Sequence, residues 1–165
     1  MDSIPDFSVY LEESGNSSFL IFSHRAISYS QLKNYEAALE DYEMMLKLKP
    51  GNREALKGKC NVFYEMKEWR KLAELVSEIL PSEQQSQKDV SLENGKIGTS
   101  KTLSQEKAKM LRLRAQAFIS LQEHNNALVD LENLLEIEPT NKYANTWIEN
   151  IREFTERDKL STKDN

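Results

Sequence analysis

The chain has 165 residues, 22 basic and 27 acidic side chains and a formal net charge of −5, a length that suits one domain and excludes two sizeable ones. The acidic balance disfavours a nucleic-acid binder, and the single cysteine excludes an internal disulfide framework and fits a reducing compartment. The chain starts with acidic Met1-Asp2 and its apolar runs are short, so we expect a cytoplasmic protein without a signal peptide or membrane span.

The first segment, residues 1–18, does not match the rest of the chain. If a helical unit begins at Phe19, then Val9-Tyr10-Leu11 falls where a preceding helix pair would end, and the first helix of that pair is absent. The apolar start Phe19–Phe22 needs a cover, because end units of helical arrays usually carry polar outer faces. Two interpretations stay open: the chain is the C-terminal part of a longer array, or residues 5–13 form a short helical cap.

Residues 19–52 predict two antiparallel helices. Apolar residues recur at spacings of three and four, which is typical of one helix face. The polar pair Lys33-Asn34 separates the two patterns, and Pro50-Gly51 ends the second. The two stripes are Phe22, Ala26, Tyr29 and Leu32, then Ala38, Leu39, Tyr42, Met45 and Leu46.

The same pattern recurs 89 residues later without a gap. Because one helix pair cannot bury both of its faces, repeated pairs must stack on their neighbours. The matched positions include Phe22 and Leu111, Arg25 and Arg114, Ala26 and Ala115, Tyr29 and Phe118, Ala38 and Ala127, Asp41 and Asp130, and Pro50 and Pro139.

At these positions the chain resembles the tetratricopeptide-repeat (TPR) family. The order of an aromatic residue, a small residue, Tyr, Ala, an aromatic residue and Pro is that of its unit of about 34 residues. The resemblance covers residues 19–80 and 107–139. It implies an all-α, right-handed superhelical solenoid of antiparallel helix pairs, with three TPR-like repeats, a C-terminal capping helix and a groove that binds polypeptides.

The 89-residue offset leaves room for a third repeat and an insertion of about 21 residues. Residues 53–81 fit a degenerate middle repeat, with Leu72 where a small residue is usual and Pro81 ending the second helix early. Residues 82–104 are rich in Ser, Gln and Lys, so we expect a disordered spacer, although its hydroxyls could be phosphorylated. Thr102 with Gln105, or Ser104 alone, could cap the next helix.

The last repeat is expected over residues 105–139, followed by a capping helix over 140–158 and a frayed tail over 159–165. The capping helix has one charged face and one apolar face, as the end of a solenoid requires. The apolar face is predicted to hold Tyr143, Ala144, Trp147, Ile148, Ile151 and Phe154.

Nothing in the sequence indicates an active site, so we expect no enzyme, no metal and no cofactor. His24 and His124 have no partner at metal-ligand spacing, and no phosphate-binding loop or nucleophile elbow is present. Cys60 occupies the small-residue position of the middle repeat. A buried, inert thiol is favoured there over a reactive one.

The first helix of each repeat is expected to line the groove with the side chains that lie off its packing stripe. Lys57 and Asn61 are one turn apart beside Tyr64, so they could hold a peptide carboxylate or backbone. Individually such residues could also be ordinary exposed side chains. The predicted binding set is Ser23, His24, Ile27, Gln31, Lys57, Asn61, Tyr64, Arg112 and Gln116, with Glu65, Lys109 and Ser120 beside it.

The stretch Phe22–Ala26 is similar to one in TPR co-chaperones, and this resemblance implies heat-shock chaperones as partners. Those domains hold two carboxylates in a clamp of lysines, asparagines and an arginine. Here His24 stands in the place of the central asparagine, and Glu54 and Gly58 in the places of a lysine and an arginine. Each missing charge-assisted contact would cost roughly 1.5–3 kcal/mol, so we expect the clamp to be weakened or lost.

We therefore predict a protein-interaction adapter that binds an extended or helical peptide segment, as a monomer or weak homodimer. One alternative is a scaffold subunit that self-associates or docks through its exposed N-terminal helix around Phe19–Ile27. Another is an accessory region of an enzyme whose catalytic domain lies outside this sequence.

Overall fold

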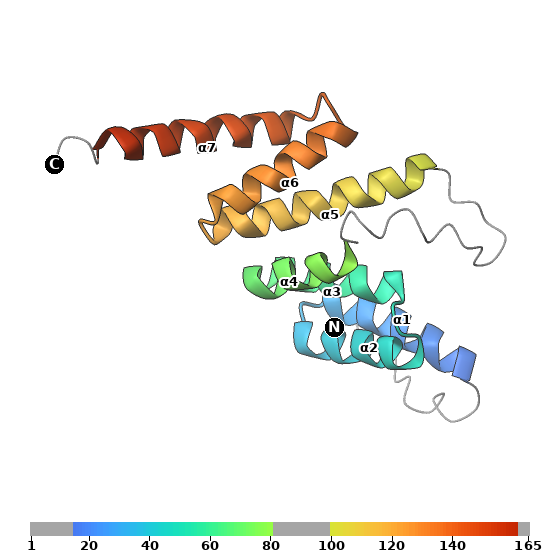
Figure 1. The fold of residues 1–165 in the computed structure, drawn as a ribbon. Coiled ribbons are helices and arrows are strands. Elements are labelled where there is room, and N and C mark those ends of the chain that lie inside the picture. The colour runs from blue at the N-terminus through green and yellow to red at the C-terminus, as the bar shows by residue number, and fades with distance from the viewer. Residues whose placement is uncertain (1–14, 81–99, 162–165) are drawn as a thin grey trace. The chain divides into compact units, whose positions relative to one another are not determined.

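The computed structural model describes residues 15–80 and 100–161, in which every regular element is an α-helix (Figure 1). The expected all-α fold class is confirmed. The seven helices of this part of the chain are α1 (Gly15–Gln31), α2 (Tyr35–Leu48), α3 (Arg53–Glu65), α4 (Trp69–Ile79), α5 (Ser100–Ser120), α6 (His124–Ile137) and α7 (Lys142–Ser161).

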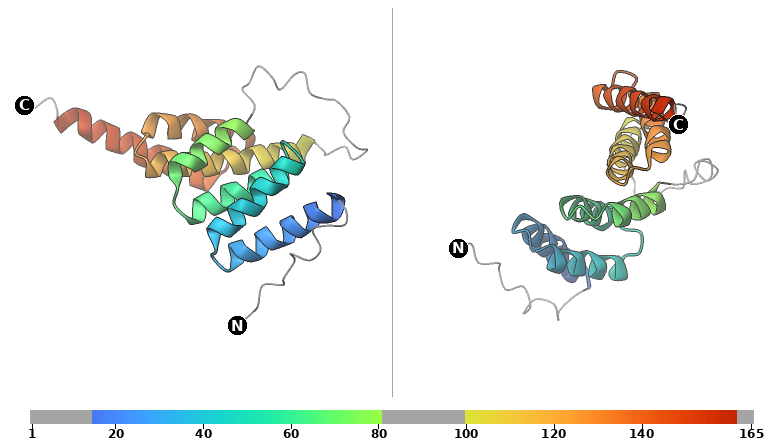
Figure 2. Two further views of the ribbon diagram at one scale, coloured as in Figure 1. Left: turned by 90° about the horizontal axis from the view of Figure 1, so that it is seen from below. Right: turned by 90° about the vertical axis from the view of Figure 1, so that its left-hand side faces the viewer.

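The chain divides into two compact units between α3 and α4. Unit 1 is Met1–Glu68 and contains α1 to α3, and unit 2 is Trp69–Asn165 and contains α4 to α7. Within each unit, consecutive helices pack against one another. Figure 2 shows the two helix hairpins, α1–α2 in unit 1 and α5–α6 in unit 2. None of the described helices is both long and apolar enough to cross a bilayer.

A left-handed residue follows α1, α3 and α5 alike. Lys33, Lys67 and Gln122 have φ values of 59°, 58° and 61°. This conformation is uncommon for residues other than glycine, so its recurrence indicates that the turns after α1, α3 and α5 have the same tight geometry. After the first turn, Asn34 caps α2 by accepting a hydrogen bond from the backbone N–H of Ala37. The turn expected at Lys33-Asn34 is therefore present.

A proline followed two residues later by an asparagine ends one helix and starts the next. Asn52 Oδ1 accepts from the backbone N–H of Ala55 at 2.9 Å, and Asn141 Oδ1 accepts from that of Ala144 at 3.1 Å. Both caps satisfy amide groups that helix starts leave without a partner. Gly51, between Pro50 and Asn52, has a φ of 73°, which suits a residue without a Cβ.

Each hairpin contains an arginine–aspartate pair in which two N–H groups meet two carboxylate oxygens. In unit 1, Arg25 donates from Nε to Asp41 Oδ2 at 2.7 Å and from Nη2 to Oδ1 at 2.6 Å. In unit 2, Arg114 donates in the same way to Asp130 at 2.8 and 2.7 Å. Both carboxylates are almost fully buried. Such burial is costly for an unpaired charge, so each aspartate depends on its arginine.

Small residues set the separation of the two helices in each hairpin. Ala26 and Ala38 of unit 1 are completely buried, as are Ala115 and Ala127 of unit 2. Other buried residues complete the two cores. These are Phe22, Tyr42, Met45, Ala55 and Val62 in unit 1, and Ala108, Leu111, Leu131, Leu134, Ala144, Ile148 and Ile151 in unit 2.

Several element boundaries differ from those expected. Helix α5 begins at Ser100, so the expected insertion ends earlier than residue 104. The expected caps at Thr102 or Ser104 are wrong, because both residues lie inside this helix. Lysine, leucine and glutamine in this stretch favour helix, which explains the extension. Helix α7 likewise continues to Ser161. Expectations for residues 1–14, 81–99 and 162–165 lie outside the described residues.

Two apolar residues are more exposed than their stripes predict. Leu32 follows the last residue of α1 and is 51% exposed. Phe154 of α7 is equally exposed, and its ring contacts His124 with centroids 5.3 Å apart. Both lie at the edge of the regular packing, where helical spacing alone does not determine burial.

Close packing of α2 against α3 requires glycine at position 58. A Cβ built on Gly58 would lie 2.2 Å from Cζ of the Tyr42 ring, far inside van der Waals contact. Tyr42 is buried, so its ring has little room to move aside. Burial also raises the pKa of the Tyr42 phenol, which keeps the group neutral.

We predict that Gly58→Ala lowers the free energy of unfolding by about 1–3 kcal/mol, the usual cost of overpacking, despite the higher helix propensity of alanine. Urea denaturation followed by circular dichroism measures this change. Tyr42→Leu, which introduces the residue type found at the matched position Leu131, should relieve the clash, so that Gly58→Ala becomes neutral or stabilising in that background. Stabilisation by Gly58→Ala with Tyr42 in place would contradict the contact.

Candidate functional site

Two helices of unit 1 present a largely exposed face of mixed chemistry, in which Lys57 is half-buried. Helix α1 carries His24, Ile27 and Gln31, and α3 carries Lys57, Asn61 and Tyr64; in each case the spacing of three and four places them on one side of the helix. Helices α1 and α3 contact one another. These six residues are called the α1–α3 face, and all belong to the predicted binding set.

A hydrogen bond joins the two halves of this face. Ser23 Oγ of α1 donates to Glu54 Oε1 of α3 at 3.1 Å. Ser23 is only 6% exposed, so it ties the helices together and offers a ligand little surface. Glu54, which the prediction omitted, is exposed one turn before Lys57. That spacing was the available signal that its carboxylate belongs to the same face.

The α1–α3 face combines apolar contact with hydrogen-bonding capacity. Ile27 and Tyr64 are 41% and 38% exposed, and the side-chain amides of Gln31 and Asn61 are exposed as well. Amides both donate and accept hydrogen bonds, so they can pair with the N–H and C=O groups of an extended peptide backbone. Lys57 provides a cation that Glu54 balances, so the face is close to neutral.

In unit 2, the predicted residues Arg112 and Gln116 of α5 lie beside aromatic residues of α7. The Tyr143 hydroxyl donates to Gln116 Oε1 at 3.0 Å. The guanidinium carbon of Arg112 lies 4.7 Å from the centroid of the Tyr143 ring, within cation–π range. Trp147 follows, its ring centroid 6.4 Å from that of Tyr143. We call Lys109, Arg112, Gln116, Tyr143 and Trp147 the α5–α7 face.

The sequence prediction placed Tyr143 and Trp147 in the packing face of α7. The structure leaves both only partly buried, whereas Ala144, Ile148 and Ile151 form the buried stripe. Tyr143 and Trp147 are one turn apart at the edge of that stripe. Their spacing was visible in the sequence, but their contact with α5 was not.

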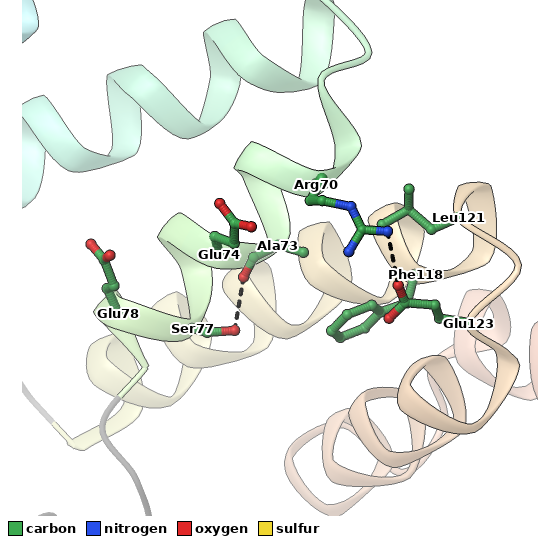
Figure 3. Close-up of a pocket in the computed structure, with 8 residues that line it drawn as sticks. All are labelled: Arg70, Ala73, Glu74, Ser77, Glu78, Phe118, Leu121 and Glu123. Atoms are coloured by element: carbon green, nitrogen blue, oxygen red, sulfur yellow. Dashed lines mark hydrogen bonds and ion pairs between the residues drawn. The ribbon is translucent and has the colours of Figure 1, made fainter.

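A shallow pocket of about 360 Å³ lies between α4 and α5 in unit 2 (Figure 3). Arg70 Nη2 reaches Glu123 Oε1 at 3.4 Å on one side of it. Figure 3 shows the carboxylates of Glu74 and Glu78 pointing away from the Phe118 ring. The polar groups therefore do not converge on one point, as they do in a specific ligand site.

The described residues include neither a metal-binding cluster nor an exposed cysteine. Within residues 15–80 and 100–161, no three His, Cys, Asp or Glu side chains lie close enough to hold a metal ion. Cys60 is buried. Burial raises the pKa of its thiol to about 11, against a smaller opposing effect of Lys59, so the protonated form dominates at neutral pH.

Comparison with known proteins identifies the repeat and the fold. Residues 20–52 match the family model of the tetratricopeptide repeat, and no curated protein sequence matches the chain. The first TPR of Spaghetti (RPAP3), solved with the HSP90 peptide SRMEEVD, is 17% identical with a TM-score of 0.60 over 84% of this chain and 93% of that one.

Two further solved structures are similar to the chain. The second TPR domain of human RPAP3, in complex with the HSP70 peptide SGPTIEEVD, is 17% identical with a TM-score of 0.59 over 84% of this chain and 98% of that one. The Arabidopsis OM64 TPR domain is 17% identical with a TM-score of 0.59 over 86% and 99%. Residues 20–52 thus match a tetratricopeptide repeat, and the chain has the fold of TPR domains.

We predict that Cys60 reacts with a disulfide reagent at pH 8 far more slowly than a free cysteine. With a pKa of about 11, only about one thiol in a thousand is ionised at pH 8, and the thiolate is the nucleophile. Absorbance at 412 nm with Ellman's reagent follows the reaction, and urea should accelerate it as the chain unfolds. Native reactivity equal to that of the unfolded chain would contradict the burial.

Proposed function

We propose that this chain is a non-enzymatic adapter that binds a peptide segment of a partner protein on the α1–α3 face. The observation that carries the proposal is the exposure of Ile27 and Tyr64 beside the amides of Gln31 and Asn61 on two contacting helices. The fold supports it, because two similar TPR domains were solved with bound peptides. A reducing, cytoplasmic setting suits its single buried thiol.

An extended peptide fits this chemistry best. The two amides satisfy backbone N–H and C=O groups of the ligand, while Ile27 and Tyr64 contact its side chains. Lys57 can bind a carbonyl or a single carboxylate. The Ser23–Glu54 bond holds α1 and α3 in place, so little ordering is needed when the peptide arrives.

Heat-shock chaperone tails are one candidate partner class, taken from the peptides recorded for the similar domains. Those peptides contain two consecutive glutamates and a terminal aspartate. On the α1–α3 face they would meet Glu54 and a single lysine, Lys57. Like charges at close range disfavour binding, so we propose that this face prefers peptides of mixed or neutral charge.

The first test is a loss of affinity in the double variant Lys57→Ala/Asn61→Ala. Peptides are selected from a display library with the full chain, and their Kd values are measured by fluorescence anisotropy. Losing one charge-assisted hydrogen bond and one neutral one removes roughly 2–4 kcal/mol, so we expect Kd to rise at least tenfold. The acidic peptide SRMEEVD serves as a comparison and should bind more weakly than the selected peptides.

Lys47→Ala/Asn125→Ala is the matched control, because it removes the same two side-chain types from exposed positions of α2 and α6. It should bind the selected peptides like the parent chain. If the Lys57/Asn61 variant also binds every peptide like the parent, the α1–α3 face is not the binding site. Failure to select any peptide would contradict the proposed function itself.

A scaffold role has one observation in its favour. Leu20 of α1 is 58% exposed, on the same stripe as His24 and Ile27, and an exposed apolar stripe can bind another helix. Under the adapter proposal, light scattering after size exclusion shows a monomer at every concentration. A dimer that grows with concentration, and that Leu20→Gln abolishes, would instead support self-association through α1.

A further inference from the structure

The α5–α7 face holds an arginine that is oriented but not neutralised. The Arg112 guanidinium is stacked 4.7 Å above the centre of the Tyr143 ring, and the Tyr143 hydroxyl is fixed by its bond to Gln116. Stacking leaves the N–H groups at the edge of the guanidinium free to bind an anion. By contrast, Arg114 on the same helix uses its donors on Asp130 and Ser77.

A second cation accompanies Arg112. Lys109 is exposed three residues earlier on α5, a spacing that brings two side chains together on a helix surface. No carboxylate among the described residues pairs with Arg112 or Lys109. Two unpaired cations side by side repel each other, and an anion bound between them would remove that cost.

Aromatic surface borders the two cations. Trp147 is partly exposed next to Tyr143, so a ligand that places an anion on Arg112 can also lay an apolar group against the indole. An anionic group beside apolar side chains is found in peptides more readily than in small metabolites. The geometry therefore favours a polypeptide ligand with one strong negative charge.

We propose that the α5–α7 face binds a phosphorylated serine or threonine in a partner protein. A phosphoryl group carries a charge of about −1.5 to −2 at neutral pH and three acceptor oxygens. Its oxygens can accept a bidentate pair of hydrogen bonds from Arg112 and a further hydrogen bond from Lys109. A single carboxylate carries one charge and would leave one of the two cations without a partner.

The inference rests on the proposed function only in that the ligand is a segment of another protein. It uses a different unit, different side chains and a different ligand charge. Variants of the α1–α3 face should therefore leave phosphopeptide binding unchanged. A variant that loses peptide binding on one face should therefore retain it on the other, so failure of one proposal can be told apart from failure of the other.

The test compares three forms of the same peptides with the full chain. Nonapeptides selected from an array with a fixed central phosphoserine are resynthesised with serine or glutamate at that position, and Kd values are measured by fluorescence anisotropy. We expect the phosphorylated form to bind at least tenfold more tightly than either of the others. Its binding should also shift the indole N–H signal of Trp147 in an NMR spectrum.

Arg112→Gln should reduce the advantage of the phosphorylated form to less than twofold. Arg112→Lys should restore only part of this advantage, because lysine keeps the positive charge but lacks the paired N–H donors of the guanidinium group. Arg157→Gln is the control, since Arg157 is an exposed arginine of α7 paired with Glu153. Equal Kd values for phosphoserine and serine would overturn the inference. Equal values for phosphoserine and glutamate would show a carboxylate site and overturn the assignment of phosphate.

Discussion

The structure depends on a charge that could not be buried alone. In each hairpin an aspartate of the second helix lies within the packed interior, and an arginine of the first helix meets both of its oxygens. A one-residue slip between the helices would separate the pair and leave a buried carboxylate without a partner, which is strongly unfavourable. The pair therefore fixes the register of α1 on α2, and of α5 on α6, while buried alanines set their distance.

Register determines which side chains are left for other molecules. Once Arg25 and Arg114 face their aspartates, the helix period places Ile27 on the outer side of α1 and Gln116 toward α7. The same scaffold thus presents two surfaces of different chemistry. The α1–α3 face is nearly neutral and rich in amides, whereas the α5–α7 face concentrates positive charge next to aromatic rings, in a chain whose net charge is −5. The ligands proposed for the two faces therefore differ in charge.

Much of the fold follows from helical spacing, which predicts the stripes of the hairpins, the turn at Lys33-Asn34 and the burial of the small residues. Periodicity identifies one face of one helix, but it does not say which neighbour that face meets. The Ser23–Glu54 bond and the contact of Arg112 with Tyr143 depend on such neighbours, so they could not be predicted. The start of α5 was misjudged because serine and threonine near a helix suggest caps, although adjacent helix-forming residues can extend the helix past them.

A double-mutant cycle on Arg25 and Asp41 measures how strongly the buried aspartate depends on its arginine. The free energy of unfolding is measured for the parent chain, Arg25→Met, Asp41→Asn and the double variant, and the cycle is repeated with Arg114 and Asp130. We expect a coupling energy of at least about 2 kcal/mol in each hairpin, because either single change leaves a buried polar group unpaired. A coupling energy below about 0.5 kcal/mol, as for an exposed ion pair, would contradict this dependence.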